Sequence, residues 1–247
     1  MIRSLILMFQ FMTRLPIPIQ IDMDKKTISK GILFLPLVGM VVGAISWIVY
    51  YLLSFINRDV AALGAMVANV IATGGLHIDG LSDTCDGFFS ARSRDRILEI
   101  MKDSRIGTFG VIAIIIVLLS KYILISNLSQ DILPATLILV FGASRFGAAL
   151  LITFGKSARP GGLGDMFSSS SIKGYFWLSA IIFTAIGAVF GGWAFIAALI
   201  VVIVSSLLLM RRSYKIIGGL TGDVYGAGIE LCDILGLITF MVVGEWI

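Results

Sequence analysis

GGLHIDGLSDTCDGFFSARSRDRILEIMKDSRIG, residues 74–107, concentrates the charge of a chain that is otherwise mostly hydrocarbon. The stretch contains the only histidine, His77, together with six of the fifteen acidic residues and five of the nineteen basic ones. Charged groups are costly in apolar surroundings, so this concentration needs a structural or a chemical reason. The segment is accordingly the first candidate for a functional site.

The acidic residues of this segment follow a helical spacing. Asp79, Asp83 and Asp86 stand at i, i+4 and i+7, which would place three carboxylates along one face of a helix. A second set stands at i, i+4 and i+8: Asp95, Glu99 and Asp103. The pattern predicts two acidic helix faces joined by Gly87.

A row of carboxylates has to be stabilised. Two of them about 6 Å apart repel each other by roughly 1 to 3 kcal/mol, so the row must be solvated, neutralised or bound to cations. Mg²⁺ binds oxygen ligands, keeps several waters and bridges one or two carboxylates to a substrate phosphate, which makes the segment a candidate magnesium site. The alternative is a solvated surface whose acids pair with neighbouring basic residues: Arg92, Arg94, Arg96, Lys102 and Arg105.

The composition indicates an all-α, polytopic membrane protein. Of the 247 residues, 58% are hydrophobic and 14% are charged, and the mean hydropathy is +1.01. The apolar runs are too long for barrel strands, so the spans are expected to be helices. The net charge of +4 comes from basic residues scattered between these runs, which excludes a nucleic-acid-binding face. Cys85 and Cys232 are too few for a disulfide framework or a zinc site.

Seven apolar runs are long enough to cross about 30 Å of hydrocarbon. They cover residues 31–56, 60–76, 106–126, 132–154, 174–190, 193–210 and 229–247. Before them, residues 2–14 predict a helix that lies in the membrane interface. We expect residues 1–247 to form a single transmembrane catalytic domain.

The basic residues predict the orientation of this bundle. Sixteen of the nineteen Lys and Arg residues lie before the first run or in the second, fourth and sixth loops between runs. Short cytoplasmic loops are enriched in these residues. The N-terminus and the acidic segment are therefore predicted to face the cytoplasm, and the C-terminus to lie outside.

The loop at residues 155–167 is a second candidate on the same predicted side. Lys156 and Arg159 stand there beside a glycine run, as in a loop that folds over a phosphate. An ordinary cytoplasmic turn would have the same composition, so both interpretations remain open.

A third candidate lies near the last span. Asp223 is expected on the preceding loop, and Glu230 and Asp233 at the mouth of the span, where acids need a cavity or a partner. Arg145, inside the fourth span, is a natural counter-charge for these acids or for an anionic substrate. Lys121 is expected at the end of the third span.

These segments together resemble a known enzyme family. HIDGLSDTCDG at residues 77–87, followed by RSRDRILEIMKDSRIGTFGVIA at 92–113, closely resembles the adenosylcobinamide-GDP ribazoletransferases, also called cobalamin synthases. The resemblance continues in the same order through FMTRLPIP at 11–18, SARPGGLGDMF at 157–167 and GGLTGDVYGAGIEL at 218–231. It therefore touches every loop on the predicted cytoplasmic side.

The resemblance implies assembly of the cobalamin nucleotide loop at the cell inner membrane. A GDP-activated corrinoid, adenosylcobinamide-GDP, would donate its cobinamide phosphoryl group to the 3'-hydroxyl of α-ribazole or of α-ribazole 5'-phosphate, with Mg²⁺ as cofactor and GMP as leaving group. Such a transfer needs charge neutralisation and alignment, which metal-bound carboxylates and cationic side chains provide. A homo-oligomer and association with other enzymes of cobalamin synthesis are left open.

This framework gives each candidate residue a role. The catalytic and metal-binding set is Asp79, Asp83, Asp86 and Asp103. The substrate-binding set is His77, Lys102, Arg105, Arg145, Lys156, Arg159, Asp223 and Glu230. An uncoordinated carboxylate or His77 would accept the proton of the hydroxyl, and the alternative for His77 is a structural role at the end of the second span.

Two other functions compete with this one. Asp83-Thr84-Cys85-Asp86-Gly87 matches the start of the motif of CDP-alcohol phosphotransferases, but Ala91-Arg92 follows one residue late. A transporter or cation channel is the non-enzymatic alternative. The acids are expected to cluster in one cytoplasmic zone with none at the middle of a span, which argues against a path across the bilayer.

Overall fold

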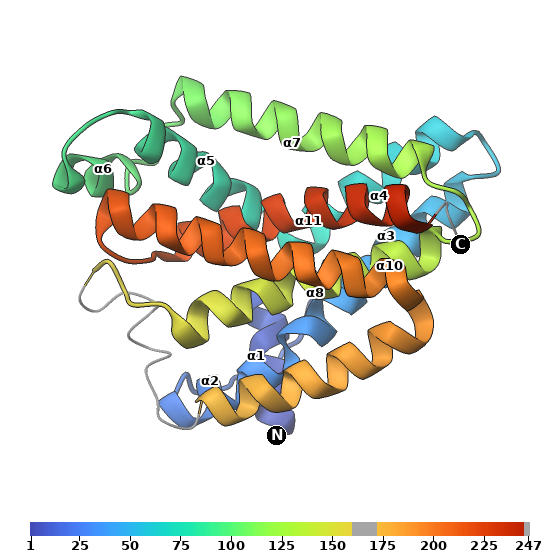
Figure 1. Ribbon diagram of the computed structural model, residues 1–247, viewed down its shortest axis with the longest axis horizontal. Coiled ribbons are helices and arrows are strands. Elements are labelled where there is room, and N and C mark those ends of the chain that lie inside the picture. Colours follow the sequence, from blue (N-terminus) through green and yellow to red (C-terminus); the bar gives the residue numbers. More distant parts are fainter. Residues whose placement is uncertain (160–171, 245–247) are drawn as a thin grey trace.

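The computed structural model describes residues 1–159 and 172–244, and within this part of the chain every regular element is a helix. The all-α prediction is confirmed. In chain order the helices are α1 (Ile2–Met12), α2 (Lys25–Gly31), η1 (Ile32–Phe34), α3 (Leu35–Leu53), α4 (Arg58–Thr73), α5 (Leu76–Phe89), α6 (Arg94–Ile100), α7 (Thr108–Asn127), α8 (Leu133–Phe154), α10 (Ile172–Ile217) and α11 (Gly222–Gly244) (Figure 1).

Within the described residues, five helical segments are long and apolar enough to cross a membrane. They are Lys25–Leu53, α7, α8, α10 and α11, and the pair α4 and α5 adds a sixth candidate that is bent by 86°. The predicted count of seven is therefore not confirmed. The two spans predicted at 174–190 and 193–210 correspond to the two helical halves of α10, which meet at Gly192, with φ 54°, where the chain reverses and runs back along the bundle (Figure 1).

Helix α8 is the central element of the bundle. Within its most apolar 18 residues, 89% are buried inside the bundle, compared with 22% for α7. Gly39 and Gly43 of α3 face the backbone of α8 at Phe141 and Leu137, so closely that a Cβ on either glycine would collide with it. The small residues of the spans therefore permit close helix contact, as the sequence predicts.

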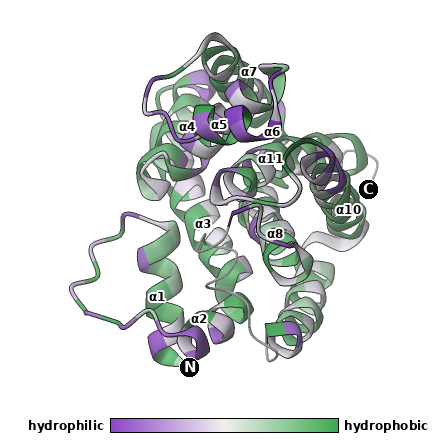
Figure 2. Cartoon of the chain, turned by 90° about the vertical axis from the view of Figure 1, so that its left-hand side faces the viewer, coloured by the Kyte–Doolittle hydropathy of each residue, from purple (hydrophilic) through white to green (hydrophobic). Residues whose placement is uncertain are grey.

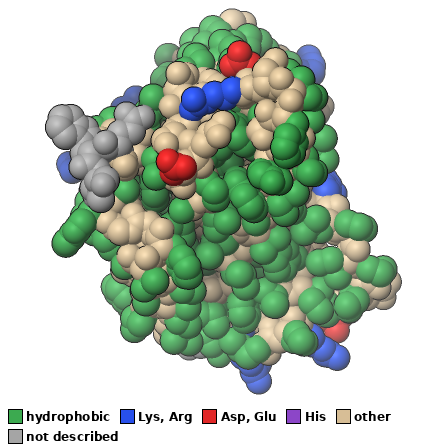
Figure 3. All heavy atoms as spheres, turned by 90° about the vertical axis from the view of Figure 1, so that its right-hand side faces the viewer, with side chains coloured by type: hydrophobic (Ala, Val, Ile, Leu, Met, Phe, Trp, Pro, Cys, Tyr) green, Lys and Arg blue, Asp and Glu red, His purple; other side chains and the backbone are tan. Residues whose placement is uncertain are grey.

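The two ends of the bundle differ in polarity. Helix α6 lies at one end, beside the N-termini of α7 and α11 (Figure 1), and we call this end the α6 end. Hydrophilic residues gather on α5 and α6 there (Figure 2). Apolar side chains cover most of the opposite end, where charged side chains are sparse (Figure 3). Polar chemistry is thus concentrated at the α6 end.

Two consecutive glycines make the bend between α4 and α5. Gly74 and Gly75 have φ values of 63° and 72°, and their backbone N–H groups donate to Ile71 O and Val70 O, both at 3.0 Å. Residues with a Cβ adopt this left-handed conformation at a cost of roughly 1–2 kcal/mol, which glycine avoids. The glycine pair therefore ends α4 and redirects α5 across the bundle.

The first prediction concerns this bend. Nothing lies within 4 Å of a Cβ built on Gly75, so Gly75→Ala tests backbone strain alone. We expect it to lower the free energy of unfolding in detergent by about 1–2 kcal/mol. Gly75→Asn should cost less, because asparagine tolerates the left-handed region. Equal losses in the two variants would contradict this explanation of the bend.

Candidate active site

Helix α5 carries the first set of acidic residues as predicted. Asp79, Asp83 and Asp86 all lie on Leu76–Phe89. The predicted joint at Gly87 was wrong, because Gly87 is inside α5 and the chain turns later, where Ala91 has φ 53°. Helix α6 ends at Ile100, so Asp103 lies in the turn beyond it and not on a second acidic helix face.

A cavity of about 620 Å³ opens beside α5 at the α6 end. Its lining includes Asp79, Asp83 and Asp103, three of the four predicted metal-binding residues. Lys102, predicted to bind phosphate, lines the same cavity, and so does Arg14. We call it the acidic cavity. It brings carboxylates and cations into one space, as phosphoryl chemistry requires.

The carboxylates of α5 repel one another. Asp79, Asp86 and Asp223 all raise the electrostatic energy of ionised Asp83. Within the described residues neither Asp79 nor Asp83 has an ion-pair partner. This crowding is unfavourable for stability and leaves Asp79 and Asp83 free to bind a cation.

The second set of acids behaves differently. Asp95 pairs with Arg94 at 3.2 Å and Glu99 with Arg96 at 2.7 Å. These pairs are the solvated surface that the alternative interpretation of the segment predicts. That interpretation is therefore confirmed for α6, and it does not extend to Asp79 and Asp83.

Asp103 both lines the cavity, like Asp79 and Asp83, and pairs with an arginine, like Asp95 and Glu99. It lines the acidic cavity, yet its Oδ2 lies 2.6 Å from Nη2 of Arg105. Hydrogen bonds from the Arg105 side chain and backbone lower the pKa of this carboxyl to about 2. Asp103 is thus ionised at physiological pH, and its charge is shared with a cation that was predicted to bind phosphate.

Asp86 caps helix α7. Its Oδ2 accepts the backbone N–H of Gly107 at 2.7 Å, and its Oδ1 accepts that of Gly110 at 2.8 Å. An acid at a helix N-terminus satisfies free N–H groups and interacts favourably with the helix dipole. Asp86 does not line the acidic cavity but a neighbouring one of about 280 Å³, together with Asp103. It anchors α7 to α5.

Asp223 lies next to α5, although not on a loop as predicted. Helix α11 begins at Gly222, so Asp223 belongs to its first turn. The two helices touch at Gly80, where an added Cβ would come within 2.8 Å of Asp223 O. Because Gly80 has no side chain, α11 can bring Asp223 beside the acids of α5.

The residues of the predicted phosphate loop lie further away. Arg159 donates from Nη2 to Leu98 O at 2.7 Å, and Arg94 donates to Ala158 O at 2.9 Å, so the start of the loop is attached to α6. Neither Lys156 nor Arg159 lines the acidic cavity, although the charge of Arg159 attracts the Asp223 carboxylate. Residues 160–167 of this loop are outside the described residues.

The deepest charges form an ion-pair network inside the bundle. Lys121 Nζ lies 2.7 Å from Glu230 Oε2 and 2.8 Å from Asp233 Oδ2, and Arg145 Nη1 lies 3.2 Å from Asp233 Oδ1. All four side chains are at most 2% exposed. Lys121 was predicted at a span end and the acids at the mouth of a span; both placements were wrong, because mutual pairing allows burial.

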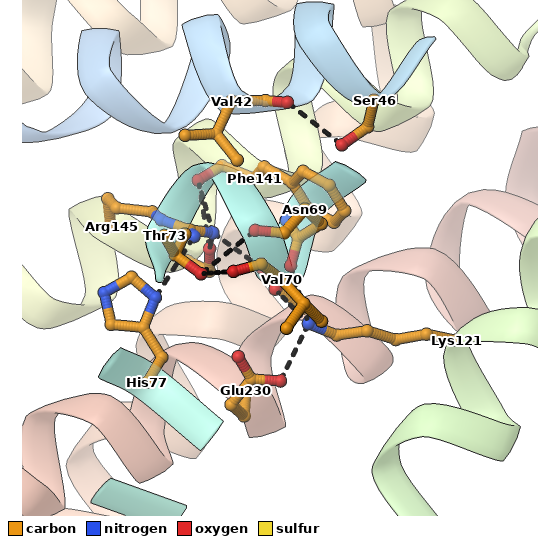
Figure 4. A network of polar contacts seen from close by, with 12 residues as sticks. Val42, Ser46, Asn69, Val70, Thr73, His77, Lys121, Phe141, Arg145 and Glu230 are labelled. Atoms are coloured by element: carbon orange, nitrogen blue, oxygen red, sulfur yellow. Dashed lines mark hydrogen bonds and ion pairs between the residues drawn. The ribbon is translucent and has the colours of Figure 1, made fainter. Parts of the chain in front are cut away.

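Arg145 connects this network to α5. Its Nη2 lies 3.3 Å from Nδ1 of His77, at the start of that helix (Figure 4). Asn69 of α4 also accepts from Lys121, at 3.5 Å, so the network joins α4, α5, α7, α8 and α11. The expectation that no acid lies deep within a span was wrong. Two cations and two anions neutralise each other there, and Arg145 and Glu230, predicted to bind substrate, are bound to partners of the same chain.

The acidic cavity suits a hard divalent cation by its donor chemistry. Carboxylate oxygens are the ligands that Mg²⁺ prefers, with only one or two of them beside waters and a substrate phosphate. In the described part of the chain no three His, Cys, Asp or Glu side chains already converge on one point. Asp79 and Asp83, with Asp103 in the same cavity, therefore fit a metal held jointly with a substrate.

Sequence reasoning missed Arg14. It counted Arg14 only as a topological charge, although the residue belongs to the FMTRLPIP segment that carries the family resemblance. In the structure its backbone N–H donates to Ala72 O at 2.8 Å, its side chain packs beside Gly74, and it lines the acidic cavity. The sequence does not show that Arg14 reaches the cavity, because this depends on its contacts with the α4–α5 bend.

The fold and the site define a class: a polytopic, all-helical membrane protein with carboxylates and cations gathered in one cavity at one end. Residues 4–241 match the family described as cobalamin-5-phosphate synthase, and the chain belongs to that family. It is therefore a transferase of cobalamin synthesis that acts on small-molecule substrates.

Similar proteins support this assignment over nearly the whole chain. An adenosylcobinamide-GDP ribazoletransferase of Clostridium novyi (strain NT) is 39% identical over 241 residues, covering 97% of this chain and 96% of the relative. One of Escherichia coli (strain K12) is 40% identical over 244 residues, covering 95% and 97%. No solved structure matches the fold.

The second prediction concerns the buried network. Lys121→Met leaves one negative charge uncompensated inside the bundle, so we expect it to lower the free energy of unfolding in detergent by about 3–5 kcal/mol. The double variant Lys121→Met/Glu230→Gln restores neutrality and should recover most of that loss. A double variant no more stable than Lys121→Met would show that charge balance is not what the network provides.

Proposed function

We propose that this transferase moves the cobinamide phosphoryl group of adenosylcobinamide-GDP to the 3'-hydroxyl of α-ribazole or α-ribazole 5'-phosphate and releases GMP. The observation that carries the proposal is the acidic cavity, where Asp79, Asp83 and Asp103 share one space with Lys102 and Arg14. Relatives that cover nearly the whole chain are named for this donor and for a ribazole acceptor.

The chemistry breaks one phosphorus–oxygen bond and forms another. The 3'-oxygen of the acceptor attacks the phosphorus attached to cobinamide, and the bond to the GMP oxygen breaks. Lys102 and Arg14 hold the phosphate oxygens and offset their negative charge. Asp86 keeps the start of α7 against α5, so that the walls of the cavity stay aligned during the transfer.

Mg²⁺ would be held by Asp79 and Asp83, with Asp103 in the same cavity, and would supply charge neutralisation at the diphosphate. The proton of the attacking hydroxyl goes to a carboxylate of the site that does not hold Mg²⁺. His77 is a poor alternative as the base, because its Nδ1 faces the permanently protonated Arg145. Lys156 and Arg159 stand outside the acidic cavity and would act on the part of the donor that extends from it, whereas Asp223 lines a smaller pocket that shares Asp79 with that cavity.

The α6 end is proposed to face the cytoplasm from the cell inner membrane. The distribution of Lys and Arg supports this orientation, since sixteen of nineteen lie on the loops that the positive-inside rule assigns to that side. Both polar substrates would then reach the acidic cavity from the compartment in which nucleotides are made.

The third prediction tests the reaction itself. Purified protein in detergent, given adenosylcobinamide-GDP, α-ribazole and Mg²⁺, should release GMP, and release should stop on addition of EDTA and resume with excess Mg²⁺. The matched control is CDP-diacylglycerol with an alcohol, which should give no CMP. GMP release that is unaffected by EDTA would remove Mg²⁺ from the proposal, and CMP release would favour a lipid-headgroup enzyme.

The fourth prediction concerns Asp83. Asp83→Asn should lower GMP release by at least about 100-fold, the scale expected when a group that organises transition-state charge is lost. Its melting temperature should equal or exceed that of the wild type, because repulsion from Asp79, Asp86 and Asp223 is relieved. Glu99→Gln, which changes a paired surface acid, is the control and should retain activity. Full activity in Asp83→Asn would exclude this residue from the site.

A further inference from the structure

A second, smaller pocket adjoins the acidic cavity. It has a volume of about 130 Å³ and lies between α1, α5, α8 and α11. Leu76 and Asp79 belong to the lining of both spaces. A molecule that occupies the small pocket can therefore extend past Asp79 towards the proposed site of transfer.

The walls of this pocket are mostly apolar. Met12 comes from α1, Ile152 from α8 and Ile229 from α11, and all three side chains are buried. Ligand sites commonly combine such walls with a few oriented polar groups. Its volume is closer to that of one small apolar ring system than to that of the corrin ring or guanosine diphosphate.

The lining also contains the polar side chains of Asp79, Asp223 and Tyr225, and His77 supplies a neutral hydrogen-bond donor. Arg145 is always protonated and only donates, so at 3.3 Å its Nη2 donates to His77 Nδ1 and the ring proton resides on Nε2. His77 lines the pocket, and its Nε2 is buried with no hydrogen-bond partner among the described residues. A buried donor without an acceptor is unfavourable, and a ligand that offers an acceptor would relieve it.

We propose that this pocket binds the base of the acceptor and that His77 selects it. The inference rests on the proposed function, in which the acceptor is a ribazole. The base of ribazole is a flat benzimidazole with two methyl groups and one unprotonated ring nitrogen. Its apolar edge would lie against Met12, Ile152 and Ile229, and its ribose would point to Asp79. Its ring nitrogen would accept from His77 Nε2 after a small shift of the imidazole, since Nε2 has no exposed surface in the free protein.

The buried ion-pair network thereby acquires a role in specificity. Asp233 holds Arg145, Arg145 fixes the tautomer of His77, and His77 presents a donor to the base. His77 is a binding residue in this scheme, and Arg145 is a positioning residue. In this scheme the small pocket binds and selects the base, and the phosphoryl transfer takes place in the acidic cavity.

The fifth prediction tests His77 with two acceptors in one variant. Wild type should favour α-ribazole over the riboside of dimethylindole, which lacks the acceptor nitrogen, by about tenfold in kcat/KM. In His77→Phe this ratio should fall to about one, whatever the loss of overall rate. Because both acceptors meet the same folded protein, a general structural defect cancels in the ratio. A ratio that stays near tenfold overturns the role of His77.

Pocket shape is tested by Ile152→Phe, with Ile138→Phe on the same helix α8 as the matched control. Equilibrium binding of α-ribazole, measured without donor or turnover, should weaken by at least tenfold in Ile152→Phe and be unchanged in Ile138→Phe, while the KM for adenosylcobinamide-GDP stays constant. If GMP is released but α-ribazole binds both variants equally, the base does not occupy this pocket, and this inference fails while the proposed function stands. If no acceptor gives GMP, the proposed function fails with it.

Discussion

The structure depends on a closed set of charges in the interior of the bundle. Lys121, Arg145, Glu230 and Asp233 carry two positive and two negative charges and are at most 2% exposed. Each ion alone would cost several kcal/mol to bury, so the four are stable there only as a neutral group. The four residues come from α7, α8 and α11, and Arg145 also contacts His77 of α5. The helix that carries the acidic cavity is thus oriented by contacts formed far from solvent.

The bend at Gly74 and Gly75 sets the direction in which α5 leaves α4. A straight continuation of α4 would leave Asp79 and Asp83 along a membrane span, where unpaired acids are costly. The 86° change of direction lays α5 across α11 and α7, with His77 towards the buried charges and Asp83 towards the acidic cavity. One short helix is therefore anchored in the hydrophobic interior at its start and carries unpaired carboxylates further along. The start of α5 anchors the helix through His77, and its later residues supply the carboxylates of the acidic cavity.

Local patterns predicted what depends on local chemistry. The spacing of Asp79, Asp83 and Asp86 identified α5, and the apolar runs identified the helical membrane bundle, because period and hydropathy are properties of neighbouring residues. The wrong placements of the buried charges involve contacts between distant segments. Glu230 and Asp233 were placed at a span mouth because Lys121 and Arg145, their partners from α7 and α8, are more than eighty residues away in sequence. The cap that Asp86 forms on α7 could not be predicted either, because it depends on where Gly107 and Gly110 fold back. Arg14 was missed for the same reason. The role of Asp86 as a metal ligand stays a prediction.

The two kinds of acid in one segment explain why sequence spacing alone could not separate a site from a surface. Asp95 and Glu99 have the same spacing as Asp79 and Asp83, but their arginine neighbours lie on the same short helix and neutralise them locally. Helix α5 carries no Lys or Arg between Leu76 and Phe89, so no such pairing is available to it. The absence of a local counter-charge on a half-buried helix is the property that distinguishes Asp79 and Asp83. A cation bound with the substrate would be the missing counter-charge, and a carboxylate pair that awaits a bound cation is costly for stability but suited to catalysis.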